Sequence, residues 1–215
     1  MEDPFRNCSA DDLSRLEIIE TLRFDSGEGL VRRDLHLARM ARSAAAFEFP
    51  FARDAALAQL GLATGPIPLR VRLTLDHSGR FGVTTAPLAP APALWAFSLA
   101  SHRLEATDPW LRHKTTRRAL YDQTRAALPT GVDEVIFGNT DGALCEGTIT
   151  TIFVQKRDRL LTPALSAGLL PGVLRQSLLE DGRAEEAALT IADLATAEAV
   201  FLGNSLRGLI LARQV

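Results

Sequence analysis

The chain has 215 residues, of which 47% are apolar and only 6% aromatic, so we expect one or two domains with cores built mainly from Leu, Ala, Val and Ile. The formal net charge of −2 argues against nucleic-acid binding through bulk charge. The two cysteines, Cys8 and Cys145, indicate neither a disulfide framework nor a metal site. The polar, acidic N-terminus and the lack of a roughly 20-residue apolar run predict a cytoplasmic protein without a signal peptide or a membrane span.

Hydrophobic patterning predicts a small first domain over residues 1–104, made mostly of antiparallel strands with one or two helices. In its clearest strand, Leu69, Val71, Leu73 and Leu75 share one face, and polar residues occupy the other. Asp34 is the candidate N-cap of the first helix. The strands are expected over residues 16–24, 69–76, 81–85 and 93–100, and the helices over residues 34–47 and 53–60.

Residues 105–111, which include an Asp-Pro break, are expected to link this domain to a larger one over residues 112–215. Pro171 suits the first turn of a helix that opens at Gly168 and runs to about Glu180. The fold class is therefore α/β, with two α+β domains. The larger domain should also contain a helix over residues 116–128, a long hairpin from 134–137 and 143–154, strands near 159–161, 187–190, 199–202 and 209–212, and a short helix at 191–195.

Lysine is scarce in this chain. Of the 24 Lys and Arg residues, only Lys114 and Lys156 are lysines. An arginine supplies charge, but only a lysine can lose its proton and act as an amine nucleophile or base. Lys156 lies in a polar Gln-Lys-Arg-Asp-Arg run typical of a surface turn, whereas Lys114 lies between the Asp-Pro break and a predicted helix. The count alone is equally compatible with an accident of composition.

A carboxylate and several groups that could donate hydrogen bonds to an anion lie elsewhere in the chain. Glu146 lies beside glycine in an apolar, β-branched strand, so it is either on an exposed strand face or held beneath a cationic ligand. The helix start at residues 168–175 would offer the backbone N–H groups of Val173 and Leu174 to a phosphate. Arg39 could pair with the same anion, although a surface arginine is the simpler interpretation. Asn204 could add hydrogen bonds, or could simply form a turn.

Taken together, these residues match the needs of pyridoxal phosphate (PLP). This cofactor requires an amine, a carboxylate opposite the pyridine nitrogen, and hydrogen-bond donors for its phosphate. The carboxylate keeps the ring nitrogen protonated, which makes the ring a better electron sink. Lys114, Glu146, Arg39 and the Val173 and Leu174 amides would supply that set.

Beyond this set, the chain resembles the class IV aminotransferases of PLP fold type IV, the D-amino acid aminotransferase-like fold, from about Ile18 to its C-terminus. The resemblance implies two α/β domains with PLP in the cleft between them, usually as a homodimer. It implies that Lys114 holds the cofactor, that Glu146 contacts the pyridine nitrogen, and that Arg39, Val173, Leu174 and the Asn204 turn bind the phosphate. The matching segments, in the family's order, are Glu20-Thr-Leu-Arg, His36-Leu-Ala-Arg-Met-Ala-Arg-Ser-Ala, His113-Lys-Thr-Thr, Asp141-Gly-Ala-Leu-Cys-Glu-Gly-Thr, Thr162-Pro, Gly168-Leu-Leu-Pro-Gly-Val-Leu-Arg and Leu202-Gly-Asn-Ser-Leu-Arg-Gly.

Within the family, the chain looks most like the 4-amino-4-deoxychorismate lyases, in the short form often fused behind aminodeoxychorismate synthase. The run from Arg112 to Asp122 and the Asn-Ser-Leu-Arg-Gly ending carry this likeness, as does Thr21, where branched-chain aminotransferases tend to have glycine. The chain departs from the family at Thr151, which stands where asparagine is usual. It also has Ala119, with Tyr121 nearby, where branched-chain enzymes place a tyrosine five residues after the lysine.

The implied activity converts 4-amino-4-deoxychorismate to 4-aminobenzoate and pyruvate in folate biosynthesis. Lys114 would remove the proton from the amine-bearing carbon, and Lys114 would deliver a proton as the enolpyruvyl group leaves, aided by Thr21 or a water. Because this amino-cyclohexadiene dicarboxylate is a dianion, Arg23 and Arg207 are candidate substrate contacts. The resemblance also suggests a functional link to aminodeoxychorismate synthase.

Two other functions remain open on the sequence. The first is an aminotransferase acting on branched-chain or D-amino acids, in which Lys114 would move a proton between substrate and cofactor. The second is a non-catalytic relative that has kept the fold and binds a small anion. The complete set of Lys114, Glu146 and Arg39 argues against the second.

Overall fold

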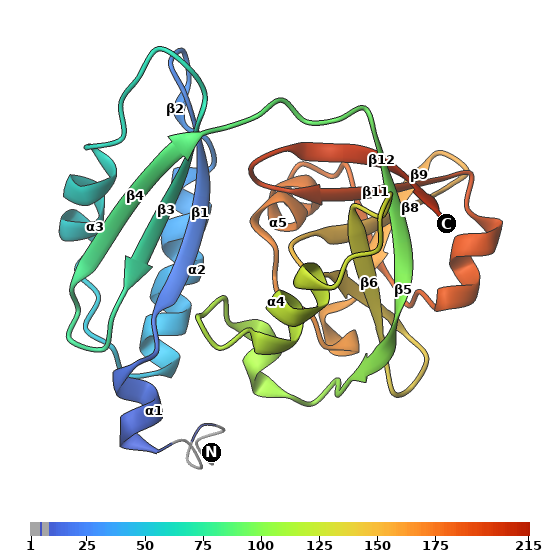
Figure 1. Ribbon diagram of the computed structural model, residues 1–215, viewed down its shortest axis with the longest axis horizontal. Helices are drawn as coiled ribbons and strands as arrows, with labels where there is room; N and C mark the ends of the chain where they lie inside the picture. Colours follow the sequence, from blue (N-terminus) through green and yellow to red (C-terminus); the bar gives the residue numbers. More distant parts are fainter. Residues whose placement is uncertain (1–4, 6–8) are drawn as a thin grey trace. The chain divides into compact units, whose positions relative to one another are not determined.

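Figure 1 shows the computed structural model of the chain, which describes residue 5 and residues 9–215. Cys8 lies outside the described residues. The chain forms two compact units, which we describe separately. Unit 1 comprises Met1–Ala89 and His113–Arg117, and unit 2 comprises Pro90–Arg112 and Arg118–Val215. In the part of the chain that is described, no helix is long and apolar enough to cross a membrane.

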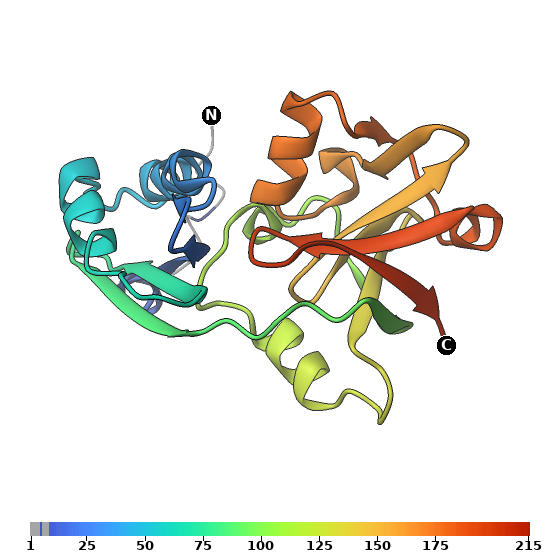
Figure 2. The same cartoon turned by 90° about the horizontal axis from the view of Figure 1, so that it is seen from above.

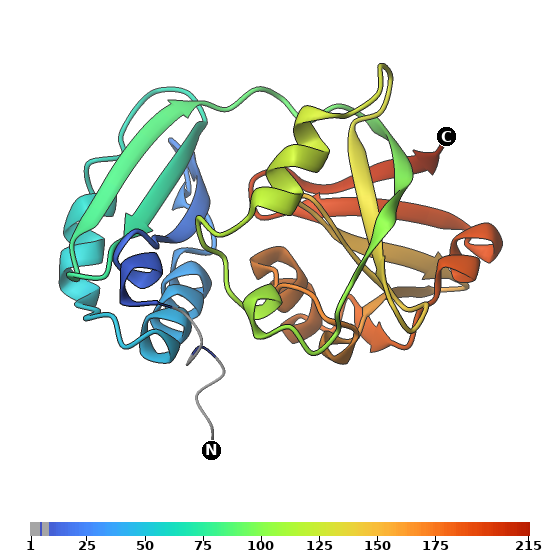
Figure 3. The same cartoon turned by 60° about the horizontal axis from the view of Figure 1, so that its bottom comes forward.

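Unit 1 is an antiparallel sheet with strand order β2-β1-β3-β4. Two helices, α2 and α3, lie on the same face of this sheet (Figure 2, Figure 3). The elements are α1 (Ala10–Ser14), β1 (Ile18–Asp25), β2 (Gly29–Leu30), α2 (Arg33–Ala46), α3 (Arg53–Leu60), β3 (Leu69–Leu75) and β4 (Phe81–Pro87).

Simple periodicities build the core of unit 1. The four alternating apolar residues of β3 are all buried, as a half-covered strand requires. On α2, Leu37, Met40 and Ala44 follow a helical spacing, and each is fully buried against the sheet. Helix α2 begins at Arg33, with Arg32 at the N-cap, so the expected N-cap at Asp34 is wrong. Asp34 instead lies in the first turn, where its carboxylate pairs with Arg53 at 2.6 Å.

A short segment, residues 113–117, returns to unit 1 and pairs with β1. The main-chain oxygen of Lys114 accepts a hydrogen bond from the Ile19 N–H at 2.8 Å, and Thr115 bridges Ile18. Because this pairing requires extended backbone, the helix expected from Thr116 starts only at Ala119. It is α4 (Ala119–Ala126).

Unit 2 is a mixed sheet in which pairing between β7 and β8 closes a barrel through β8, β11, β12, β5, β6 and β7 (Figure 1). Strands β9 and β10 extend the sheet beyond β8. The elements, besides α4, are β5 (Leu94–Leu104), β6 (Glu134–Asn139), β7 (Leu144–Gly147), β8 (Thr151–Lys156), β9 (Arg159–Pro163), α5 (Val173–Glu180), β10 (Glu185–Ala187), β11 (Ala199–Asn204) and β12 (Gly208–Gln214), with 3-10 turns at Pro109–Arg112, Leu165–Ala167 and Ile191–Thr196.

Several strands of unit 2 are buried on both faces. Ile152 and Val154 of β8 belong to one apolar cluster with Phe97, whereas Phe153 belongs to another that includes Leu174 of α5. Because neighbouring side chains of β8 pack into different clusters, the sequence of this strand is a nearly continuous apolar run and does not alternate with polar residues. This packing also fixes the first turn of α5 against the barrel wall.

The division into units corrects the expected domain boundaries. Strand β5, expected in the first domain, pairs in parallel with β6 and β12 and therefore belongs to unit 2. Residues 113–117, expected in the second domain, belong to unit 1. The chain leaves unit 1 after Ala89, returns for five residues around Lys114, and leaves again.

The expected strand over residues 143–154 is interrupted by a turn at residues 148–150. The carboxylate of Glu134, on β6, is fully buried and binds this turn. A side chain at Gly147 would collide with the Glu134 carboxylate, so glycine is required there. Glu134 accepts hydrogen bonds from the Thr148 amide (3.1 Å) and hydroxyl, the Ile149 amide (3.2 Å), the Thr150 hydroxyl (2.9 Å) and the Arg125 guanidinium (3.3 Å).

The Glu134→Gln variant tests this interaction. A carboxamide offers one acceptor oxygen and brings two N–H donors into a site built only of donors, so we expect unit 2 to lose about 1–3 kcal/mol of stability. Both tryptophans, Trp95 and Trp110, lie in unit 2, so tryptophan fluorescence in urea follows its unfolding. Glu105→Gln, at an exposed position, should change stability by less than about 0.5 kcal/mol. Equal midpoints for the two variants would contradict the role assigned to Glu134.

Candidate active site

Lys114 and its neighbours are anchored within unit 1. Beyond the main-chain bond of Lys114 to β1, the His113 ring nitrogen Nδ1 lies 2.9 Å from the Ser43 hydroxyl of α2. Lys114 itself is half-buried. The segment that carries the candidate amine is therefore held from both sides, by the sheet and by a helix.

Arg39 lies in a buried cluster of charges in the same unit. Its Nε and one terminal nitrogen donate to the two oxygens of Glu20 on β1, at 2.8 Å and 2.6 Å. Nδ1 of His36, one helical turn before Arg39, lies 2.6 Å from the same carboxylate. The exposed fractions of Glu20, His36 and Arg39 are 1%, 1% and 5%. The Glu20 carboxylate thus fixes the orientation of the Arg39 guanidinium, which we expected to bind the phosphate.

Electrostatics keeps the Glu20 carboxylate ionised. Burial alone would raise the pKa of Glu20, but Arg39 and His36 outweigh it and lower that pKa to about 2. Burial lowers the pKa of His36, an effect only partly offset by Glu20 and reinforced by the positive charges of Arg39 and Lys114. At neutral pH the cluster is therefore a carboxylate paired with a guanidinium beside a neutral imidazole.

Thr21 and Arg23 alternate with Glu20 and Leu22 along β1, so they lie on the sheet face opposite the helices. Both are half-buried. Arg23 is already paired with Asp25, through Nε at 2.5 Å and a terminal nitrogen at 3.1 Å. The structure thus separates these two candidates from the Glu20 cluster.

In unit 2, Glu146 on β7 is buried, which excludes the alternative of an exposed strand face. Its Oε1 accepts a hydrogen bond from the Tyr121 hydroxyl at 2.7 Å, and its Oε2 accepts one from the Leu170 N–H at 3.1 Å. Both of these donors are neutral. The negative charge they hold in place suits a protonated ring nitrogen.

The predicted phosphate donors, Val173 and Leu174, are the first two residues of α5. Helix α5 therefore begins after Pro171, and its N-cap is Gly172, which supplies no side-chain cap. A Cβ at Gly172 would lie 2.5 Å from the Thr151 hydroxyl. Thr151, at the position where the family usually has asparagine, thus points at the start of α5. This arrangement fits an anion held by helix N-terminal amides.

Asn204, at the end of β11, uses its side chain inside unit 2. Its Oδ1 accepts hydrogen bonds from the N–H groups of Leu206 and Arg207, both at 3.1 Å, and its Nδ2 donates to the Ile149 carbonyl at 3.3 Å. The Asn204 side chain therefore shapes the turn that carries Ser205 and Arg207, which are buried and half-buried respectively.

Our sequence reasoning missed four side chains that position these groups. Glu20 and Glu134 carried the signal that identified Glu146, an acid within an apolar strand. Tyr121 and His36 carried no local signal, because their roles depend on which helix packs against which strand.

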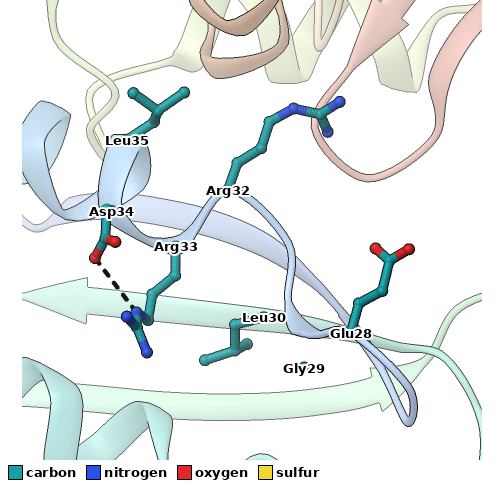
Figure 4. Close-up of a pocket in the computed structure, with 7 residues that line it drawn as sticks. All are labelled: Glu28, Gly29, Leu30, Arg32, Arg33, Asp34 and Leu35. Carbon is teal, nitrogen blue, oxygen red and sulfur yellow. Dashed lines mark hydrogen bonds and ion pairs between the residues drawn. The ribbon is translucent and has the colours of Figure 1, made fainter.

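Figure 4 shows a pocket of about 440 Å³ in unit 1, and no predicted site residue lines it. One of its walls carries the ion pair of Arg33 with Asp34, at 3.4 Å. Within residues 5 and 9–215, no group of three or more His, Cys, Asp and Glu side chains could hold a metal ion. The pocket is lined by Glu28, Gly29, Leu30, Arg32, Arg33, Asp34 and Leu35.

Comparison with known proteins identifies the class. Residues 17–215 match the model of the amino-transferase class IV family. The chain belongs to this family and has its PLP fold type IV architecture. A crystal structure of a provisionally assigned amino-acid aminotransferase from Mesorhizobium loti shares 43% identity with a TM-score of 0.89, and the match covers 93% of this chain and 100% of that one.

More distant relatives carry different activities in their names. The chain is 30% identical to an aminodeoxychorismate lyase of Saccharomyces cerevisiae over 54% of this chain and 36% of that protein, so it spans about a third of that relative. It is 28% identical to a probable branched-chain-amino-acid aminotransferase of Thermotoga maritima over 38% of this chain and 32% of that one. A hypothetical aminotransferase of Mycobacterium tuberculosis, solved in its PLP-bound form, shares the fold with a TM-score of 0.79, 23% identity, and coverage of 92% and 80%.

The Glu20→Gln variant tests the buried cluster. The change leaves Arg39 buried without its counter-charge, so at neutral pH we expect a loss of about 3–5 kcal/mol in the free energy of unfolding. Because the pKa of Glu20 is lowered from 4.5 to about 2, its contribution is complete above pH 4.5 and is lost as the pH falls toward 2. The stability gap between wild type and variant should therefore shrink over that window.

Circular dichroism during urea unfolding at several pH values measures this gap. Glu28→Gln, at an exposed position of the same unit, is the matched control and should change stability by less than about 0.5 kcal/mol. A gap that stays constant from pH 4.5 to 2 would show that Glu20 is not the carboxylate that stabilises the cluster.

Proposed function

We propose that this chain is a PLP-dependent lyase that converts 4-amino-4-deoxychorismate to 4-aminobenzoate and pyruvate. The observation that carries the proposal is in unit 1, where Lys114 is bonded through its main chain to β1 two residues before Thr21. The candidate base and the candidate proton donor are thus on adjacent segments. The Saccharomyces cerevisiae relative, named an aminodeoxychorismate lyase, supports this activity.

The residues at hand fit PLP, and we propose that the two sets serve one cofactor. Lys114 would bind the cofactor through its amine, and Arg39, with the Val173 and Leu174 N–H groups, would hold the phosphate. Glu146 would hold a proton on the ring nitrogen. When bound, the cofactor supplies an electron sink for the carbon that bears the substrate amine.

The chain's own residues would then manage protons and charge. Lys114, as the free amine, would take the proton from the amine-bearing carbon, and the electron pair would break the carbon–oxygen bond to the enolpyruvyl group. Lys114, assisted by Thr21 or a water, would return a proton to that group, which leaves as pyruvate. Aromatisation of the ring drives the step. Arg23, which pairs with Asp25, and Arg207 are the candidate contacts for the substrate carboxylates.

The alternative within the family is an aminotransferase acting on branched-chain or D-amino acids. The likeness to the Thermotoga maritima relative favours it. The same Lys114 and Glu146 would serve both activities, so the two differ at the substrate contacts. A homodimer, a functional link to aminodeoxychorismate synthase and a cytoplasmic location stay predictions, as does the less favoured non-catalytic anion binder.

The two lysines give a matched test of the cofactor site. Lys156 pairs with Asp193 at 2.5 Å in unit 2, which is a structural role. After incubation with PLP and reduction with borohydride, peptide mass mapping should find the cofactor on Lys114 in wild type and in Lys156→Ala. Lys114→Ala should carry no adduct, and before reduction it should lack the visible absorbance of the cofactor imine. An adduct on Lys156 would overturn the assignment.

The activity is tested by offering the PLP-loaded protein both kinds of substrate. We expect 4-aminobenzoate, detected by fluorescence, together with an equal amount of pyruvate from 4-amino-4-deoxychorismate. We expect no amine transfer from valine, leucine or D-alanine to 2-oxoglutarate. Transfer without 4-aminobenzoate formation would replace the lyase with the aminotransferase.

A further inference from the structure

The one tyrosine of the chain is bonded to the carboxylate assigned to the cofactor ring. Tyr121, on α4, donates from its hydroxyl to Oε1 of Glu146 at 2.7 Å. Glu146 lies 25 positions further along the chain, on β7. The bond therefore ties a surface helix of unit 2 to a buried barrel strand at the functional side chain.

The surroundings of Tyr121 hold its ring in place. Its ring meets that of Phe137 edge to face, with centroids 5.4 Å apart. The Arg118 guanidinium lies 5.8 Å from the ring centroid and is itself fixed by the Asp122 carboxylate at 2.7 Å and the Thr148 carbonyl at 3.1 Å. A phenol restrained from two sides can direct its hydroxyl consistently at one acceptor.

We propose that Tyr121 is a positioning residue for Glu146, which holds this carboxylate ionised and in one orientation so that it can meet a protonated ring nitrogen. The inference rests on the proposed function, because the ring nitrogen is that of PLP. It assigns a role to Tyr121, seven residues after Lys114, where the sequence analysis noted only that Ala119 replaces the tyrosine that branched-chain enzymes place five residues after the lysine.

The chemistry of a carboxylate supports this role. Its two oxygens offer about four lone-pair sites in all, and the Tyr121 hydroxyl and the Leu170 N–H each donate to one of these oxygens. A hydrogen bond donated to the charged form stabilises that form where burial opposes it. Burial and the Glu146 charge raise the pKa of Tyr121 well above its ordinary value, so the phenol stays protonated and remains a donor.

The hydrogen bond can be tested in the protein without cofactor. Because Tyr121 is the only tyrosine, the ultraviolet absorbance of tyrosinate reports on this residue alone. In the folded wild type we expect no tyrosinate signal at pH 10, the ordinary pKa of a tyrosine. In Glu146→Gln the signal should emerge at a pH lower by about one unit or more, because the repelling charge is gone. Titration at pH 10 in the wild type, unchanged in Glu146→Gln, would overturn the proposal.

A double-mutant cycle tests the positioning role through PLP affinity, measured by equilibrium dialysis. Tyr121→Phe keeps the ring and its packing, so we expect it to fold and to bind PLP about ten-fold or more weakly than the wild type. In the Glu146→Gln background the same change should have little further effect, because the charge it supports is absent. A purely structural tyrosine would weaken binding equally in both backgrounds, which would overturn the role.

The outcomes separate this inference from the proposed function. Wild-type protein that binds PLP, with Tyr121→Phe binding it equally well, overturns the role of Tyr121 and leaves the function standing. Wild-type protein that binds no PLP overturns both, whatever the tyrosinate titration shows about the hydrogen bond itself.

Discussion

A carboxylate taken out of water must be matched by donors, and this constraint governs how the described part of the chain is built. Glu20, Glu134 and Glu146 are all buried, and all lie on strands. Each obtains its donors from an element distant in sequence: α2 for Glu20, the turn at 148–150 for Glu134, and α4 for Glu146. The three acids therefore decide which helices and turns are fixed against which strands.

The three sets of donors differ, and the difference separates structural acids from the acid proposed to serve chemistry. Glu20 is matched by the Arg39 charge, so the pair is nearly neutral and aims a guanidinium. Glu134 accepts from the amides and hydroxyls of a single turn and from the Arg125 guanidinium, which leaves it little capacity for anything else. Glu146 accepts hydrogen bonds from the Tyr121 hydroxyl and the Leu170 amide, and in the proposed function it is the acid that holds a proton on the cofactor ring nitrogen.

Local pattern predicted the elements well where burial alone decides them. The alternation in β3 and the bounds of α3 were confirmed, as was the family of the chain. Apart from the N-cap expected at Asp34, where α2 begins one residue earlier, these misses came from contacts between distant residues. The helix expected at Thr116 starts late because Thr115 pairs with Ile18, and the strand expected through residue 150 breaks because Glu134 binds its middle. The roles of Glu20 and Tyr121 were not predicted, because the partners that define them lie 19 and 25 positions away.

The contrast between residues held by structural partners and half-exposed residues of β1 explains how one fold can support two candidate activities. The residues that we propose for both activities each have a structural partner: Lys114 is bonded through its main chain to β1, Arg39 to Glu20, and Glu146 to Tyr121. Thr21 and Arg23 lie instead on the face of β1 that the helices leave uncovered, and no buried acid of the sheet depends on them. Substitution at these positions would cost little in folding, because their environment is half-exposed. In the proposed function, selection for a substrate can thus act on that face of β1 without disturbing the buried acids within either unit.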